Sequence, residues 1–205
     1  STLEGVDRSQ LAGKLPSVFE TLESQLRTLQ KRIDTLDPLS TSRRQTKEPF
    51  SIDELVQQVV DARHEQCKRH HVSVSIVSTS KKAWRVKAVR GMMIQILENL
   101  LANSFYWLKQ QKIVEPGLKP SIMIEIDQAS GTIDISDNGP GIEAADAENI
   151  FKPFVSAKPP GEGSGLGLYI ARELAEYHNW TLSLVGPADD KVWHRFSLDI
   201  GSKSK

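Results

Sequence analysis

The stretch GEGSGLGLYIAREL, Gly161 to Leu174, has glycine at every second position as far as Gly167 and then continues as a helical pattern. Glycine loses more conformational freedom on folding than any other residue, so this density needs a reason. Glycines before a helix let the backbone approach a ligand, and the first helical turn offers unpaired N–H groups at the positive end of the dipole. The stretch therefore indicates a phosphate site, with a flexible loop and a tight helix–sheet contact as the alternative.

The glycine spacing excludes the two commonest phosphate-binding motifs. It does not follow the G-x-G-x-x-G pattern of dinucleotide-binding folds, and no Gly-Lys-Ser/Thr follows it as in a P-loop. If this stretch holds phosphates, it does so by another scheme.

Composition narrows the class of protein. The 205 residues include 26 Lys plus Arg and 26 Asp plus Glu, and this zero net charge argues against a dedicated nucleic-acid binder. The single cysteine, Cys67, excludes a disulfide framework and fits a reducing, cytoplasmic setting. No apolar run approaches the ~20 residues of a membrane span. Because the chain begins at Ser1 without Met, we expect it to be a piece of something longer.

Three regions are expected along the chain. Residues 1–37 predict a long helix, because leucines recur every seven residues as in a helix that packs on another helix, although a single amphipathic helix on its own domain would fit too. Residues 38–50, rich in Pro, Ser, Thr and Arg, favour a linker. Residues 51–205 have the pattern of a globular domain.

The globular region mixes helical and strand patterns. Ser51 followed by Glu54 is a capping signal for a first helix. Helical periodicity also covers residues 90–111 and 165–178. Alternating apolar residues predict strands, the last four of them in two hairpins, at residues 72–77, 121–127, 131–137, 181–185 and 192–200. The expected architecture is a two-layer α/β sandwich with helices on one face of a mixed sheet.

A second motif is DISDNGPGI, Asp134 to Ile142. Asp137 stands at a strand end, where its carboxylate can accept a hydrogen bond from an exocyclic amine. Gly139 and Gly141 would let a flat ring lie against the backbone. A plain turn is the alternative, because Asp, Asn, Gly and Pro are the usual turn residues.

A third motif lies on the helix IQILENLLANSFYWL. Asn99 and Asn103 are four residues apart and share one face, which Gln95 and Tyr106 extend. Burying such polar side chains is costly unless they find partners. An Asn carbonyl oxygen can bind Mg²⁺, which also binds nucleotide phosphates. The alternative is a solvated polar stripe.

In this order the motifs resemble the nucleotide-binding domain of the sensor histidine kinases, in the superfamily shared with DNA gyrase, Hsp90 and MutL. ENLLANS resembles the asparagine box, DNGPGI the first glycine box, IFKPFVSAK the phenylalanine box and GEGSGLGL the second glycine box. The resemblance covers roughly residues 50–200 and implies a Bergerat-type ATP-binding fold. The leading helix resembles the second helix of a dimerisation bundle.

The resemblance implies a role for each motif. Asn103 would coordinate Mg²⁺ bound to ATP, and Asn99 would support the phosphate site. Asp137 would bind the adenine amine, beside Gly139, Gly141 and Ile142. The phosphates would be wrapped by Gly163, Ser164, Gly165, Leu166, Gly167 and Leu168.

Residues 143–161 would form a short lid whose hinge is anchored by Phe151 and Phe154. Lys158 in this lid would reach the terminal phosphate and act in catalysis with Asn99 and Asn103. Tyr106 stands where many of these kinases have a lysine. We keep Tyr106 among the nucleotide-binding residues, with Lys158 or Lys109 as the substitute for that lysine.

The resemblance also separates kinase from hydrolase. In the hydrolysing branch a glutamate stands four residues before the metal-binding asparagine and activates water. Here that residue is Asn99, and the adjacent Glu98 is turned about 100° away along the helix. The sequence therefore predicts slow hydrolysis and phosphoryl transfer to an outside acceptor.

The expected acceptor is a histidine on a helix upstream of Ser1. His64 is expected at the surface, because it lies in the first helix of the nucleotide domain and lacks a following Pro-Leu. Implied partners are a second copy of the chain, through the leading helix, and the receiver domain of a response regulator. The alternatives are a nucleotide-gated binding module and an anti-sigma-type serine kinase.

His178 and Asn179 stand at a helix end where many relatives have His-Gly-Gly. Asn179 can adopt the left-handed torsion of a C-terminal cap, so we expect a structural role for His178. No role is assigned to His194.

Overall fold

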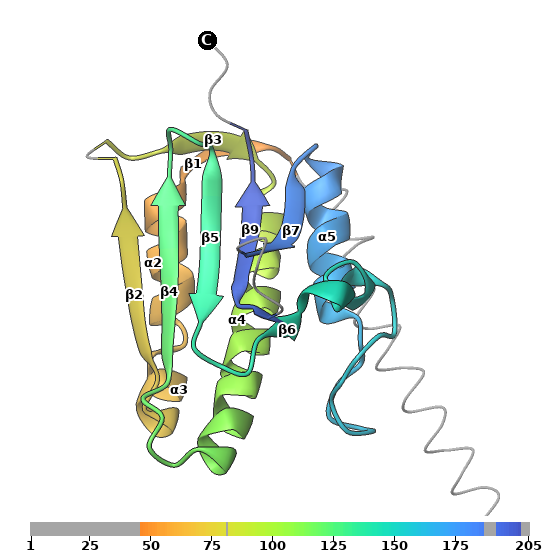
Figure 1. Cartoon of the computed structure of the whole chain (residues 1–205). Coiled ribbons are helices and arrows are strands. Elements are labelled where there is room, and N and C mark those ends of the chain that lie inside the picture. The colour runs from red at the N-terminus through yellow and green to blue at the C-terminus, as the bar shows by residue number, and fades with distance from the viewer. Residues whose placement is uncertain (1–45, 81, 187–191, 202–205) are drawn as a thin grey trace, which may run out of the picture. The chain divides into compact units, whose positions relative to one another are not determined.

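The computed structural model describes residues 46–80, 82–186 and 192–201 (Figure 1), within one compact unit, Thr41–Lys205. The expected leading helix, residues 1–37, and most of the expected linker lie outside the described residues. The dimerisation helix and the three region boundaries therefore remain predictions.

Five strands form the central sheet in the order β2-β4-β5-β9-β7. They span Ser73–Ser78 (β2), Ser121–Asp127 (β4), Thr132–Asp137 (β5), Arg195–Asp199 (β9) and Thr181–Val185 (β7). The β2–β4 pair is parallel, which requires a long crossover between the two strands, and the other pairs are antiparallel. The predicted mixed sheet and both predicted antiparallel pairs are confirmed.

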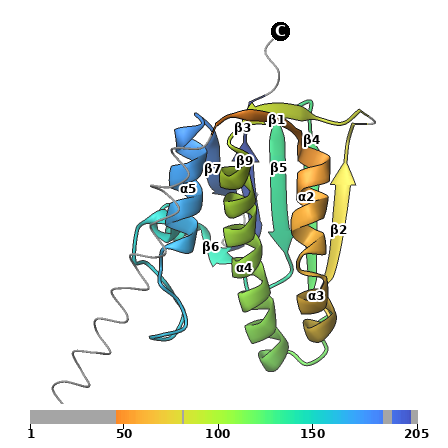
Figure 2. The same ribbon diagram turned by 180° about the vertical axis from the view of Figure 1, so that it is seen from behind.

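The helices lie on one face of this sheet, as Figures 1 and 2 show from opposite sides. They span Ile52–Asp61 (α2), His64–His70 (α3), Arg90–Val114 (α4) and Gly167–Tyr177 (α5). The predicted two-layer α/β sandwich is therefore confirmed. In the described part of the chain, no helix has both the length and the hydropathy needed to cross a bilayer.

The core lies between α4 and the helix-facing side of the sheet. In β4 every second residue is buried, and in β5 Ile133 and Ile135 continue the same alternation. Helix α4 presents apolar side chains to the sheet and to the flanking helices, buried at Met92, Met93, Ile96, Leu97, Leu100, Leu101, Phe105 and Leu108. This burial fixes which face of α4 is left for its polar side chains.

The first helix begins as the capping signal predicts. The Ser51 hydroxyl accepts a hydrogen bond from the Glu54 N–H at 3.3 Å. Two short strands were not expected: Glu48–Ser51 (β1) pairs with Arg85–Ala88 (β3), although the sequence placed residues 48–50 in a linker. Pro49 suits this position, because a two-stranded ribbon leaves one edge that needs no N–H donor.

The end of α5 confirms the structural role of His178. Asn179 has a φ of +59°, the left-handed torsion that the sequence predicts for it. The buried His178 ring accepts the Val89 N–H at Nε2 (3.0 Å), so its proton lies on Nδ1, 3.1 Å from the Leu174 carbonyl oxygen. One neutral imidazole thus joins the end of α5 to the start of α4.

The strand expected over residues 192–200 is two strands. Val192–Trp193 (β8) pairs with Ile142–Glu143 (β6), and His194 separates β8 from β9. The turn expected between β7 and this segment, at residues 187–190, lies outside the described residues.

Candidate functional site

A cavity of about 670 Å³ opens beside α4, next to the segment that follows β5 and the start of α5. All three sequence motifs contribute to its lining. Ten of the predicted site residues line it, namely Asn99, Asn103, Gly141, Ile142, Lys158, Gly163, Ser164, Gly165, Gly167 and Leu168. Chain segments more than sixty residues apart in sequence are therefore brought to one site.

Four predicted site residues do not line the cavity: Tyr106, Asp137, Gly139 and Leu166. The Leu166 side chain is fully buried, so only its backbone can belong to a phosphate-binding turn. Lys109, the substitute considered for the missing lysine, is exposed and does not line the cavity either. Asp137 and Tyr106 lie immediately behind or beside the lining residues, as described below.

Asp137 is placed by the strand period. It is the last residue of β5 and follows Ile133 and Ile135 at intervals of two, so its carboxylate points toward the helix-covered face. Burial raises the pKa of Asp137, while the Ser104 hydroxyl, the Gly139 N–H and His194 oppose that rise. A half-buried acid thus stands at the end of β5, three residues before Pro140, which lines the cavity.

The turn after Asp137 keeps this acid in place. Its Oδ1 accepts the Gly139 N–H at 2.9 Å, and a Cβ on Gly139 would come within 2.8 Å of the same oxygen. The Asn138 side chain accepts from the Ser121 N–H (2.8 Å) and donates to the Lys119 carbonyl (2.9 Å), which ties the turn to β4. The bonds of Asn138 and the bond from Gly139 to Asp137 are contacts of a turn, and the adenine contact of Asp137 remains a prediction.

Gly141 needs to be glycine for two reasons. Its φ is +71°, and a Cβ there would lie 2.4 Å from Cγ1 of Val192 and 2.6 Å from Cε1 of His194. The second reason is crowding, because Val192 of β8 and His194 pack against this glycine. His194 therefore lies behind a glycine that lines the cavity, a contact that the sequence did not suggest.

Asn99 and Asn103 both line the cavity from α4, as their four-residue spacing predicts. Nδ2 of Asn99 is buried and has no hydrogen-bond partner among the described residues, which leaves a donor for a ligand. Its Oδ1 lies 3.4 Å from where a Cβ on Gly167 would be, at the first turn of α5. Glu98 is exposed and is absent from the lining, so it points away as expected.

The start of α5 has the features of an anion site. No side chain caps this helix, and its first residue, Gly167, lines the cavity. The Ser164 hydroxyl accepts the Leu166 N–H at 3.3 Å, which shapes the turn just before the helix. The first-turn amides and the positive end of the α5 dipole are therefore directed at the cavity.

Residues 155–164, here called the lid loop, connect two residues that lie next to each other, Phe154 and Gly165. This pair is here called the neck. Phe154 and Gly165 both have left-handed torsions, with φ of +65° and +66°, and the Phe154 N–H donates to the Gly165 carbonyl at 2.9 Å. A Cβ on Gly165 would come within 2.5 Å of the Phe154 carbonyl carbon. These contacts are made by the backbone of Phe154, whereas its side chain is 56% exposed.

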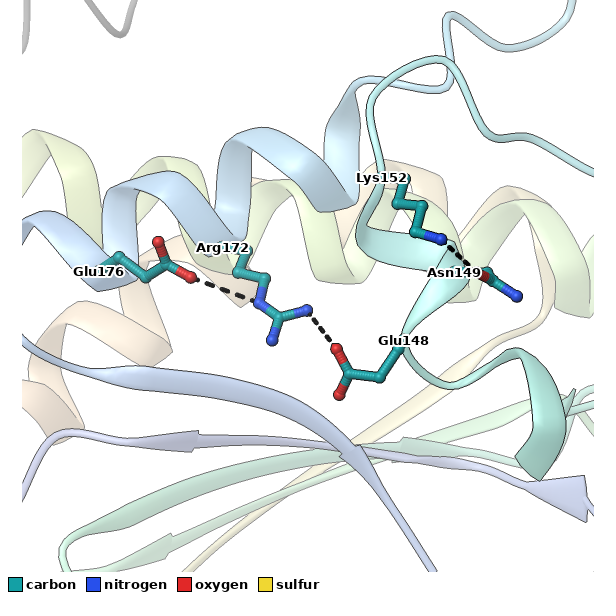
Figure 3. A network of polar contacts seen from close by, with 5 residues as sticks. All are labelled: Glu148, Asn149, Lys152, Arg172 and Glu176. Carbon is teal, nitrogen blue, oxygen red and sulfur yellow. Dashed lines mark hydrogen bonds and ion pairs between the residues drawn. The ribbon is translucent and has the colours of Figure 1, made fainter.

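The segment before the neck is fixed to α5 (Figure 3). Arg172 pairs with Glu148 at 2.9 Å and with Glu176 at 3.4 Å, and its guanidinium lies 4.8 Å from the Phe151 ring centroid. The Phe151 ring is buried and meets Phe196 of β9 edge to face. Phe151 is therefore held firmly just before the neck, with Arg172 as a partner that the sequence did not indicate, and its role as the hinge of a lid remains a prediction.

Tyr106 and two residues of the lid loop contact one another beside the cavity. The Tyr106 hydroxyl donates to Oε2 of Glu162 at 2.8 Å, and Nζ of Lys158 lies 4.1 Å from the Tyr106 ring centroid. Burial lowers the pKa of Lys158, and the Glu162 carboxylate opposes that shift. Burial and the hydrogen bond to Glu162 raise the pKa of the Tyr106 hydroxyl.

Several lining residues were not predicted. Trp107 lines the cavity from α4, and Asn149 and Ile150 line it from the base of the lid. Trp107 is four residues after Asn103 on the same helix, so the helical period could have predicted that it faces the same side. The other two lie in irregular chain, for which no period predicts a direction.

The arrangement fits a nucleotide with a divalent cation. Asn99 offers a buried donor without a partner among the described residues. The Ser104 hydroxyl lies by the Asp137 carboxylate, whose pKa it lowers. Asn103 supplies a carbonyl oxygen of the kind that Mg²⁺ accepts. The Asp137 carboxylate behind the lining and the uncapped helix start in the lining suit a molecule with a polar ring and a phosphate tail.

Residues 88–200, more than half of the chain, match the family model described as histidine kinase-, DNA gyrase B-, and HSP90-like ATPase. The chain is 27% identical over 195 residues to the sensor protein ChvG of Agrobacterium fabrum, an alignment that covers 89% of this chain and 32% of that protein. It is 35% identical over 100 residues to the C4-dicarboxylate transport sensor protein DctS of Rhodobacter capsulatus, covering 48% and 14%. The chain spans about a third or less of these curated relatives.

Solved structures share this fold. The catalytic domain of histidine kinase ThkA superposes with a TM-score of 0.61 at 24% identity, covering 76% of this chain and 95% of that chain. Acinetobacter baumannii histidine kinase AdeS gives 0.64 at 19% identity, covering 96% and 95%. ThkA in complex with the response regulator protein TrrA gives 0.60 at 21% identity, covering 98% and 55%. At these identities the likeness establishes the fold.

Proposed function

The chain belongs to the histidine kinase-, DNA gyrase B-, and HSP90-like ATPase family, and from this we propose that it is the ATP-binding catalytic part of a two-component sensor histidine kinase. The observation that carries the proposal is that one cavity is lined by Asn99, by Asn103 and by the uncapped, glycine-led start of α5. Asp137, half-buried at the end of β5, would accept the adenine amine.

The phosphates would lie against the first turn of α5 and the backbone of Gly163, Gly165 and Gly167. Asn103 would hold Mg²⁺, which neutralises phosphate charge when it is bound. Asn99 would donate its unpaired Nδ2 to a phosphate oxygen or to a water held there. These groups bind, orient and neutralise, and in phosphoryl transfer such positioning supplies most of the catalysis.

The acceptor must come from outside the cavity. The cavity lining holds Glu143, Asp146 and Glu162, but none of these comes from α4 at the position four residues before Asn103. Asn99 has that place and cannot remove a proton from water. His64 is exposed at the start of α3. We therefore propose transfer to a histidine on an upstream helix, then to a receiver-domain aspartate, in a cytoplasmic dimer formed through residues 1–37.

Family membership and the sensor proteins among the curated relatives support this proposal. No feature of the site favours a binding module without transfer or an anti-sigma-type serine kinase. The latter tends to keep a glutamate at the position of Asn99.

Titration with a fluorescent adenine nucleotide in the presence of Mg²⁺ tests the site. Asp137→Asn keeps the size of the side chain but replaces one carboxylate oxygen by an NH₂ group, which cannot accept a hydrogen bond. The remaining oxygen is neutral, so its hydrogen bond from the Gly139 N–H is weakened too. We expect its affinity to fall at least tenfold, about 1.4 kcal/mol. Glu98→Gln, which changes an exposed acid on the neighbouring helix, is the matched control and should bind as the parent does. Equal affinity of Asp137→Asn and the parent would contradict the proposed adenine contact.

A further inference from the structure

The cavity is short of positive charge. Three carboxylates line it, from Glu143, Asp146 and Glu162, whereas Lys158 is the one lysine or arginine among the described residues that line it. Anions that enter this cavity depend on Lys158, on backbone amides and on any metal they bring. A triphosphate carries more negative charge than a diphosphate, so its affinity depends more strongly on where the Lys158 ammonium lies.

The Lys158 side chain is enclosed on two sides. Its ammonium lies 4.1 Å from the Tyr106 ring centroid, within the range of a cation–π contact. Its stem lies against the backbone of Gly163, where a Cβ would come within 3.0 Å of Lys158 Cδ. Lys158 is half-buried although it belongs to an otherwise exposed loop. Tyr106 and Gly163 thus leave the long side chain little freedom.

Tyr106 also holds the other charged residue of the lid loop. Its hydroxyl donates to Glu162 at 2.8 Å, so one side chain of α4 contacts both Lys158 and Glu162. The lid loop returns at a hydrogen-bonded neck, and these contacts are made by residues between the two sides of that neck, Lys158 and Glu162. Tyr106 therefore fixes the far part of the lid loop to α4.

We propose that Tyr106 is a positioning residue that seats Lys158 over the phosphate end of the cavity and thereby sets the preference for ATP over ADP. This inference rests on the proposed function and assigns to Tyr106 an action through Lys158, without a contact of its own to the nucleotide. The aromatic ring provides the seat for the ammonium. The hydroxyl provides the attachment of Glu162.

The experiment compares Tyr106→Leu, Tyr106→Phe, Lys158→Met and the double variant Tyr106→Leu/Lys158→Met, by calorimetric titration with Mg-ATP and with Mg-ADP. We expect Tyr106→Leu and Lys158→Met to lower the ADP-to-ATP ratio of Kd values about tenfold, mainly through weaker ATP binding. Tyr106→Phe keeps the ring and should keep the ratio within about twofold. The double variant should match Lys158→Met, because the ring acts only through the lysine.

A second measurement needs no nucleotide. Amide hydrogen exchange in residues 158–163 of the nucleotide-free chain should be at least threefold faster in Tyr106→Leu than in the parent, because the lid loop loses its attachment to α4. Exchange in the buried strand β5 should be unchanged, which excludes general unfolding.

The outcomes separate the two proposals. An unchanged nucleotide preference in Tyr106→Leu, equal losses for ATP and ADP, or a further loss in the double variant would overturn the role of Tyr106 and leave the ATP site standing. Unchanged exchange in the lid loop would overturn it as well. Failure of the parent to bind either nucleotide would overturn both proposals.

Discussion

At the scale of single residues, Gly165 shows how closely the backbone constrains the site. Its φ is +66°, and a side chain there would collide with the Phe154 backbone at 2.5 Å. Gly117 is the useful contrast, since a Cβ on it would meet nothing within 4 Å and its torsion is ordinary. One glycine is required by its surroundings, whereas the other is replaceable.

We therefore expect Gly165→Ala to lower the free energy of unfolding by about 1–3 kcal/mol, the usual cost of a strained backbone position. Gly117→Ala should change it by less than about 0.5 kcal/mol. Urea denaturation followed by circular dichroism measures both. If Gly165→Ala were as stable as Gly117→Ala, the neck between Phe154 and Gly165 would not be a rigid feature of the domain.

The residue scale also shows what a sequence can and cannot predict about a site. The directions of the Asn99, Asn103 and Asp137 side chains were predictable, because a helix phase or a strand period fixes where a side chain points. His194 was not found, because its nearness to Asp137 depends on the pairing of β5 with β9, sixty residues further along the chain. The contacts of Tyr106 with Lys158 and Glu162 depend on the path of an irregular loop, which has no period.

At the scale of elements, the junction of α4 and α5 depends on one neutral histidine. His178 accepts the Val89 N–H at the start of α4 and stacks on Trp180 at 4.4 Å between centroids. Burial lowers the pKa of His178 below its ordinary 6.5 in the folded chain. A protonated ring would lose its acceptor nitrogen, which leaves the Val89 N–H without its partner.

This sets a direction for the pH dependence of stability. Because the folded-state pKa of His178 is lowered, its contribution is fully present above the unfolded pKa of about 6.5 and is lost as the pH falls toward the folded value. The parent should therefore lose more unfolding free energy between pH 7.5 and pH 5 than His178→Gln does. Thermal or urea unfolding of both proteins at the two pH values measures it. A parallel decline would show that His178 is not responsible.

The long elements were predictable, and the short ones were not. Helix α4 and strands β4 and β5 carry strong apolar periods, so their positions were predicted within a few residues. β1, β3 and β8 are two to four residues long and are stabilised by pairing with distant chain. Pro49 within β1 is moreover a turn signal when it is read locally.

At the scale of the whole molecule, the cavity that we propose for the nucleotide has no acid among its described lining residues at the position where the hydrolysing branch has a glutamate. Asn99 stands there, and Glu98 is exposed on another side of α4. We expect the isolated chain with Mg-ATP to turn over well below roughly one per second, the lower end of protein kinase turnover. Phosphate release measures it. Faster turnover, or a rate that Glu98→Gln abolishes, would contradict a kinase that waits for its acceptor.

The neck of the lid loop has a further consequence for how such a domain can vary. Because the chain leaves and rejoins the fold at a single pair of adjacent residues, Phe154 and Gly165, extra residues inserted at the tip would leave the sheet and helices undisturbed. Doubling the length of such a loop costs only about 0.6 kcal/mol in loop-closure entropy. The time for which a bound molecule stays enclosed could thus diverge between related proteins while the scaffold stays the same.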